Sequence, residues 1–227
     1  MNNFEQEKDR YYEKLLALQY EASSFISHNP TKGELREEFI RRVLVDEFVH
    51  LKDYLRRGII QQKPNEHRQH DLVWLSEGAR GGMGMFDVRD CKLIIEVKST
   101  VKTSDIIAFD ALSRYYKESC VSRKGLRTGL FCYASQTSKE NVLEQFGCQF
   151  IPDEDDNYDA NEDDPIYFPE RDAVRSIDFI YCLNVDDEYV NPYFIINNAV
   201  IGGDMTRARS LFHKGTVITY FMNEFRY

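Results

Sequence analysis

One short stretch decides how this chain is expected to fold, and it reads Lys92-Leu93-Ile94-Ile95-Glu96-Val97-Lys98-Ser99. Its apolar run predicts a buried β-strand. Side chains two residues apart on a strand point to the same face, so Glu96 and Lys98 lie together. A carboxylate and an amine at the end of an apolar strand are costly to bury unless they pair or bind something. The stretch therefore predicts a polar site on this strand.

Glu96 and Lys98 have the chemistry to act on a phosphate. A carboxylate binds hard cations such as Mg²⁺, which prefer oxygen ligands, and the Val97 carbonyl between the two residues can supply another oxygen. Lys98 can orient a water molecule or stabilise the charge that develops on a phosphate. The plain alternative is a same-face ion pair on a solvated strand.

A second carboxylate is needed to hold the cation, and Asp71 is the candidate. It begins a compact strand predicted over residues 70–75, 25 positions before Glu96. A glycine-rich loop at residues 78–84 joins the two strands, so they can lie side by side. A cation held by Asp71 and Glu96 would lower the pKa of a bound water. The alternative is that Asp71 only caps the start of its strand.

The remaining pattern predicts a mixed sheet flanked by helices, an α/β fold. Helices are expected over residues 4–26, 31–53, 103–118, 138–146 and 204–213, and strands over residues 58–60, 70–75, 92–99, 129–134, 176–183 and 189–196. Residues 216–225 fit a strand or a helix equally well. We expect residues 1–150 to form the core with its N-terminal helix. Residues 151–227 are expected to add an acidic loop and an α+β extension packed on that core.

The longer pattern resembles the PD-(D/E)XK nuclease superfamily, which has the restriction endonuclease-like fold. The segments that carry the likeness are Gly33-Glu34-Leu35-Arg36-Glu37, Gly58-Ile59-Ile60, Gln69-His70-Asp71-Leu72-Val73 and Ile94-Ile95-Glu96-Val97-Lys98-Ser99-Thr100. Their order is similar to that of the DUF6602-like bacterial branch, over roughly residues 30–135. His70 stands where the superfamily's name has proline.

The resemblance implies further site residues. A helical glutamate often completes such a site, and Glu37 is preferred to Glu34 because it borders the apolar face of its predicted helix. Gln69 is placed where it can position the water or the substrate. The plain alternatives are a solvated Glu37 and a structural Gln69. The implied catalytic residues are Glu37, Asp71, Glu96 and Lys98, with the metal held by Asp71, Glu96 and the Val97 carbonyl.

The resemblance also implies an activity. It is an endonuclease that hydrolyses phosphodiester bonds with Mg²⁺, or with Mn²⁺ in its place, and DNA is the expected substrate. A bacterial, cytoplasmic and defence-related setting goes with the family. A homodimer and a partner protein both stay open. The alternative is a non-catalytic module of the same fold that binds nucleic acid or a partner protein in a larger complex.

The charge of the chain first argues against a nucleic-acid enzyme. The net charge is −9, whereas phosphate binding favours cationic surfaces. However, residues 153–164 contain eight carboxylates and no cation, so removing them from −9 leaves −1 for the rest. That segment alternates acidic and amide residues like an EF-hand loop. Tyr158 stands where such a loop requires glycine, so a solvated acidic loop is expected instead.

Other features exclude further classes of protein. No apolar run approaches the ~20 residues of a membrane span, and the first residues lack the pattern of a secretion signal. The five cysteines are scattered, without a CxxC pair, which argues against a disulfide framework or a zinc site. The glycine-rich loop lacks the Gly-Lys-Ser/Thr ending of a phosphate loop. His67 and His70 are expected in a loop or at the surface, with a general-base role as the alternative.

Overall fold

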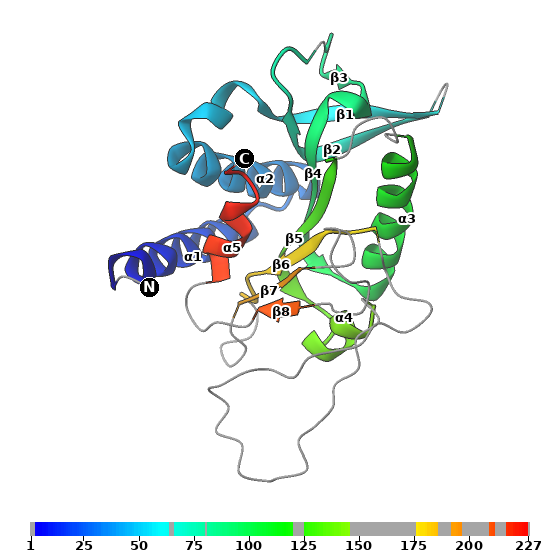
Figure 1. The fold of residues 1–227 in the computed structure, drawn as a ribbon. Helices are drawn as coiled ribbons and strands as arrows, with labels where there is room; N and C mark the ends of the chain where they lie inside the picture. Colours follow the sequence, from blue (N-terminus) through cyan, green and yellow to red (C-terminus); the bar gives the residue numbers. More distant parts are fainter. Residues whose placement is uncertain are drawn as a thin grey trace.

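The computed structural model shows an eight-stranded mixed sheet with helices on both faces (Figure 1). The structure describes residues 3–63, 66–79, 81–119, 125–145, 176–185, 192–196, 209–211 and 217–226. The strand order is β3-β1-β2-β4-β5-β6-β7-β8. The predicted α/β class is confirmed.

The elements have these bounds. The helices are α1 (Asn3–Ser24), α2 (Asn29–Glu47), α3 (Thr103–Ser119), α4 (Lys139–Gln145) and α5 (Val217–Asn223), with short 3₁₀ turns at Val49–Asp53 and Val88–Asp90. The strands are β1 (Leu55–Lys63), β2 (Glu66–Leu75), β3 (Met85–Phe86), β4 (Cys91–Val101), β5 (Arg127–Ser135), β6 (Phe179–Cys182), β7 (Tyr193–Ile196) and β8 (Arg209–Leu211).

The middle of the sheet is parallel and antiparallel pairs flank it on both sides, with the short edge strand β3 parallel to β1. β4, β5 and β6 pair in parallel, β2 joins β4 antiparallel, and β7 and β8 continue antiparallel beyond β6. Parallel strands are normally covered on both faces, which explains why they read as continuous apolar runs. Residues 128–134 of β5 are all buried, as this rule requires.

Two apolar clusters form, one on each face of the sheet. Ile94 packs in the cluster with Ile106 and Phe109 of α3. Its neighbour Ile95 packs in the other cluster, with Leu44 of α2 and Phe221 of α5. Figure 1 shows the same division, with α3 on one side of the sheet and α1, α2 and α5 on the other. Alternation along β4 therefore joins both halves of the core.

The described residues beyond 175 belong to the same sheet and core. Asp110 of α3 accepts hydrogen bonds from the Ser176 and Ile177 N–H groups at 2.8 and 3.3 Å. Asp178 accepts from Lys117 Nζ at 2.6 Å, and from the backbone N–H of Thr128 in β5. These buried bonds fasten the start of β6 to α3 and β5. The division at residue 150 stays a prediction.

Some predicted elements were wrong or incomplete. Residues 209–211, predicted within a helix, form β8, because pairing with β7 outweighs the local helical pattern. The helix predicted to reach residue 53 ends at Glu47, and a 3₁₀ turn follows. The ambiguous C-terminal segment is helical over residues 217–223. β3, which follows the glycine-rich loop, was not predicted. The acidic segment at residues 153–164 lies outside the described residues.

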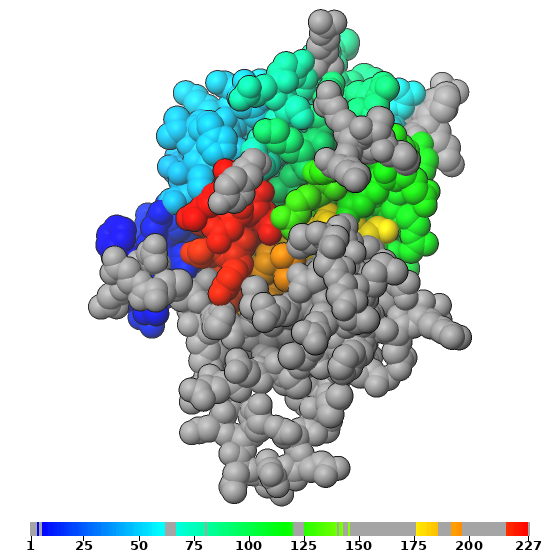
Figure 2. Space-filling model, viewed as in Figure 1, coloured from blue at the N-terminus to red at the C-terminus, as the bar shows by residue number. Residues whose placement is uncertain are grey.

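α5 fastens the C-terminal part of the chain to α1. Figure 2 shows α5 in red beside the N-terminal helices in blue. The Ile218 N–H donates to Glu13 at 3.2 Å, and the Thr219 hydroxyl donates to Asp9 at 2.6 Å. Both carboxylates are buried polar groups of α1. Within the described residues, no helix has the length and apolar character that crossing a membrane requires.

We predict that Glu13→Gln stabilises the protein at alkaline pH. Burial, aided by Asp9, raises the pKa of Glu13 to about 7 although Ile218 and Tyr181 donate to it. The folded state therefore binds this proton more tightly than the unfolded state, and stability falls as the pH rises from about 4.5 to about 7. Glutamine keeps an acceptor and avoids the loss. The expected gain at pH 8 is about 2 kcal/mol, or roughly 4–8 °C in melting temperature.

Calorimetric melting at pH 5 and pH 8 checks this prediction. The gain should largely vanish at pH 5, where Glu13 is protonated in the folded protein. Exposed Glu77 offers the matched control, and Glu77→Gln should change neither melting temperature appreciably. An equal gain for Glu13→Gln at both pH values, or none at either, contradicts the assignment.

Candidate active site

A β-bulge in β2 shapes the candidate site. Arg56 pairs with Val73, and the next pair along the two strands is Gly58 with His70. Asp71 and Leu72 of β2 therefore face Arg57 of β1 alone. The extra residue breaks the two-residue alternation of β2. His70 then contacts Tyr116 on the α3 face, whereas Leu72 packs in the cluster on the opposite face. Asp71 stands at this break.

The pairing of β2 with β4 ends next to the bulge. The last paired residues are Leu72 and Ile95, and beyond them the Asp71 carboxylate accepts the Val97 N–H at 2.7 Å. A side chain thus takes the place of a strand neighbour at this point. The N–H and C=O of one strand residue point to the same edge, so the Val97 carbonyl faces the side of Asp71. The Asp71 carboxylate and the Val97 carbonyl thus offer two possible oxygen ligands at the opening between the strands.

Glu96 lies among three groups that favour its charged form. Lys98 Nζ donates to Glu96 Oε1 at 3.0 Å, and Arg68 approaches the same oxygen at 3.4 Å. His70 Nδ1 lies 3.6 Å from Oε2. Burial alone would raise the pKa of Glu96, but His70, Lys98 and Arg68 outweigh it and lower the pKa to about 2. Glu96 is therefore ionised at every physiological pH.

Lys98 is a cation in the same setting. Burial alone would lower the pKa of Lys98, but the charge of Glu96 and the hydrogen bond between the two raise it overall. The ion pair considered as the plain alternative for Glu96 and Lys98 is thus present, though half-buried beside Asp71 rather than on a solvated face. It leaves Glu96 Oε2 buried and without a hydrogen bond.

Glu37 of α2 reaches Asp71 from the other face of the sheet. Burial and the charge of Asp71 raise the pKa of Glu37 to about 7 despite Arg57, and the protonated carboxyl donates a hydrogen bond to Asp71. Burial and the charge of Glu96 raise the pKa of Asp71 as well. Glu34 points outward, with its side chain 57% exposed and paired with Arg57 at 2.9 Å. Glu37, not Glu34, is thus the glutamate next to Asp71.

Gln69 contacts a guanidinium rather than a carboxylate. With its amide oxygen turned toward Arg57, it accepts from Arg57 Nη2 at 2.8 Å. Arg57 Nε also lies 3.1 Å from Glu37 Oε2. Arg57 therefore links Gln69 to the carboxylates, a role that sequence reasoning missed. The position of Arg57 on a strand before a glycine gave no signal of it.

His70 was expected in a loop or at the surface, and this prediction was wrong. The side chain is completely buried, and Nε2 lies 2.7 Å from the Tyr116 hydroxyl of α3. The bulge turns the His70 side chain inward, and no local sequence pattern predicts this bulge. His67, in contrast, is exposed on β2. His70 and Tyr116 thus form the buried wall behind Glu96.

The donor set fits a hard divalent cation. Asp71, Glu96 and the Val97 carbonyl offer oxygens only, which suits Mg²⁺. Burial, together with the neighbouring carboxylates, raises the pKa values of Asp71 and Glu37. Glu96 Oε2 is buried without a hydrogen-bond partner. Among the residues that the structure describes, no three His, Cys, Asp or Glu side chains form a ready-made metal group. The cations Lys98 and Arg68 hold Glu96 instead.

Two solved structures share the fold of this chain over nearly its whole length. NucC of E. coli MS115-1 in its cAAA-bound form superposes with a TM-score of 0.62 and 10% identity, covering 97% of this chain and 87% of that one. This chain has the restriction endonuclease-like fold. NucC of P. aeruginosa ATCC27853, also cAAA-bound, gives a TM-score of 0.60 at 10% identity, over 96% and 89% of the two chains.

The other comparisons are negative. No family model matches the chain, and no curated protein matches it either. The solved structures confirm the predicted fold. Membership of the DUF6602-like branch stays a prediction, because no family model matches. An identity of 10% carries the fold alone.

We predict that Glu37→Gln stabilises the metal-free protein at pH 8. The folded pKa of Glu37, about 7, lies above its usual 4.5, so above pH 7 the ionised carboxylate costs stability. Glutamine removes that charge. The expected gain is about 1 kcal/mol, or roughly 2–4 °C, measured by thermal melting in EDTA. Glu34→Gln is the control and should stay within about 0.5 kcal/mol. A loss of stability in Glu37→Gln would contradict the crowding of carboxylates.

Proposed function

We propose that this protein is a Mg²⁺-dependent nuclease that hydrolyses phosphodiester bonds in DNA. One observation carries the proposal: the bulge holds the Asp71 carboxylate at the opening between β2 and β4, with Glu37 on one side and the Glu96–Lys98 pair on the other. The restriction endonuclease-like fold supports it. Carboxylates crowded this way are unfavourable in themselves, which is typical of sites kept for chemistry.

Asp71, Glu96 and the Val97 carbonyl are the residues that would hold the cation. A bound Mg²⁺ supplies an activated water at neutral pH and offsets negative charge on the phosphate. Glu96 is already ionised, so binding requires no proton to leave it. One oxygen of Asp71 accepts a hydrogen bond from the Val97 N–H, which fixes the direction of the carboxylate. Glu37 assists by hydrogen bonding to Asp71 and holding it in place.

Lys98 acts as a cation rather than as a base. Its pKa is raised above the usual 10.5, so it stays protonated at neutral pH. A protonated amine can orient the attacking water through its hydrogen bonds and stabilise the charge that grows on the phosphate. This favours electrostatic assistance and argues against proton abstraction by Lys98.

Arg57 and Arg68 are partly exposed cations that pair with carboxylates of this group. Their side chains are 41% and 40% exposed, on the β1–β2 hairpin beside Asp71. A guanidinium presents paired donors that match a phosphate. Local charge can therefore attract a DNA backbone although the whole chain is acidic. Gln69 would keep the Arg57 guanidinium oriented beside Glu37.

Cleavage of plasmid and linear DNA with Mg²⁺ or Mn²⁺ tests the proposal. Both similar NucC structures are cAAA-bound forms, so each assay is run with and without cAAA. Asp71→Ala and Lys98→Ala should each lower cleavage by at least about 100-fold, since each removes a charge that acts on the transition state. Glu37→Ala should lower it too, whereas its matched control Glu34→Ala should retain nearly full activity.

Calorimetric titration with Mn²⁺ separates the enzyme from a non-catalytic module of the same fold. Binding by the native protein that is lost in Asp71→Ala supports the metal assignment independently of cleavage. A native protein that neither binds Mn²⁺ nor cuts DNA under any of these conditions overturns the proposal. Such a protein would be a module that binds nucleic acid or a partner protein.

A further inference from the structure

One row of large apolar side chains on α1 and the turn after it lies open to solvent. Phe4, Tyr11, Leu18 and Phe25 are 73%, 60%, 63% and 89% exposed, and each follows the last by seven residues. Single exposed apolar residues are ordinary on a protein surface. Four at a constant spacing of seven are not scattered, because residues seven apart lie on nearly the same line of a helix. α1 thus has a second apolar face besides the one that packs on the core.

A row of charges runs beside this apolar row. Glu7, Lys14 and Glu21 are also seven residues apart and exposed, so their signs alternate along the helix. Glu7 pairs with Arg10 of its own helix at 3.2 Å. Within the described residues, Lys14 and Glu21 have no ion-pair partner of their own. These two charges are therefore free to meet a partner.

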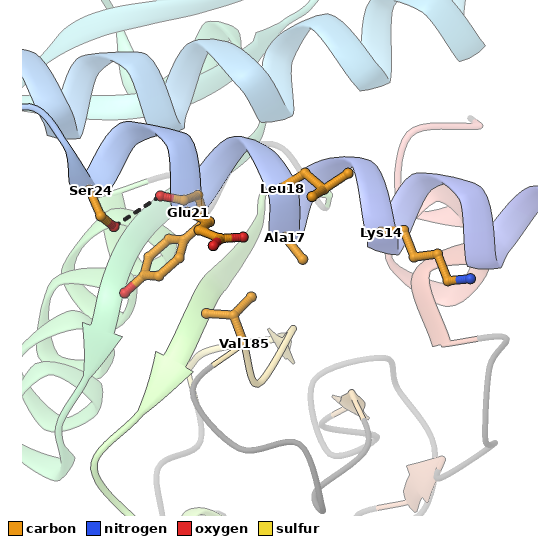
Figure 3. A pocket seen from close by; sticks show the side chains of 7 residues that line it. Lys14, Ala17, Leu18, Glu21, Ser24 and Val185 are labelled. Atoms are coloured by element: carbon orange, nitrogen blue, oxygen red, sulfur yellow. Dashed lines mark hydrogen bonds between the residues drawn. The ribbon is translucent and has the colours of Figure 1, made fainter.

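The centre of the apolar row borders a groove of about 510 Å³ (Figure 3). Leu18 and Ala17 of α1 and Val185, from the turn after β6, form its apolar lining. Lys14 and Glu21 lie toward its two ends, as Figure 3 shows along α1. An occupant of this groove would be apolar in the middle, acidic at one end and basic at the other. α1 itself has this composition when its direction is reversed.

We propose that α1 docks antiparallel against α1 of a second copy, about a two-fold axis near Leu18. Reversing the helix about a point between residues 17 and 18 puts Leu18 beside Leu18 of the partner subunit. Lys14 then lies opposite the partner's Glu21, and the symmetry makes this pair twice. Tyr11 falls near Phe25 of the partner subunit. A parallel arrangement would instead place Lys14 beside Lys14 of the partner subunit, which like charges oppose.

The seven-residue spacing fits such a contact. A straight helix drifts by about 20° per seven residues, so two helices that keep a seven-residue stripe in contact wind gently around each other. None of these side chains belongs to the candidate active site. The proposed contact is therefore independent of the nuclease proposal.

Sedimentation velocity of the full chain over a range of concentrations tests the contact. The native protein should associate reversibly, and Leu18→Glu should halve the mass of the associated species. Ile107→Glu is the matched control, because Ile107 is 53% exposed on α3, on the other face of the sheet, and should leave association unchanged. Circular dichroism confirms that each variant is folded. A native protein that stays monomeric, or association insensitive to Leu18→Glu, overturns the proposal.

Charge reversal tests the register. Lys14→Glu should weaken association by about tenfold or more, because it puts two acidic residues in contact twice. The double variant Lys14→Glu/Glu21→Lys should restore it. An equal mixture of Lys14→Glu with Glu21→Lys should associate better than either alone, since only the mixed dimer has opposite charges at both contacts. A double variant as weak as Lys14→Glu overturns the antiparallel register.

Discussion

The hydrogen bond from the Val97 N–H to Asp71 is the interaction on which the site depends. It exists because a bulge in β2 shifts Asp71 out of the regular ladder just where β2 and β4 cease to pair. A regular ladder would have used that N–H for a backbone carbonyl and sent Asp71 to one face only. The irregular strand therefore places one carboxylate within reach of both faces of the sheet.

Charge at the site is balanced locally rather than over the whole chain. Burial raises the pKa of every carboxylate here, yet Glu96 stays ionised because His70, Lys98 and Arg68 lower its pKa by more. At Asp71, burial and the charge of Glu96 outweigh Lys98 and His70, so the pKa rises. At Glu37, burial and the charge of Asp71 outweigh Arg57, and the pKa rises there too. The pKa is thus lowered at Glu96 and raised at Asp71 and Glu37, although the three carboxylates are close neighbours.

The surrounding fold makes this arrangement rigid. β4 is covered on both faces, so the strand that carries Glu96 and Val97 cannot shift without disturbing both apolar clusters. α2 brings Glu37 to one face, and α3 brings Tyr116 to His70 on the other. NucC has a similar fold at 10% identity, so the fold tolerates wide changes in side chains. The proposed chemistry rests on a few polar residues held by this frame.

Several features could be predicted from the sequence because they follow from local periodicity. The apolar run before Glu96 predicts a buried strand, the two-residue step puts Lys98 beside Glu96, and the spacing back to Asp71 suggests a neighbouring strand. Only the tertiary structure decided the rest. Helical periodicity already favoured Glu37 over Glu34, but the approach of Glu37 to Asp71 depends on how α2 packs. The burial of His70 depends on a bulge that needs β1 as its partner. β8 forms against its local helical pattern because strand pairing with a distant segment is a non-local interaction, which periodicity along the chain cannot reveal.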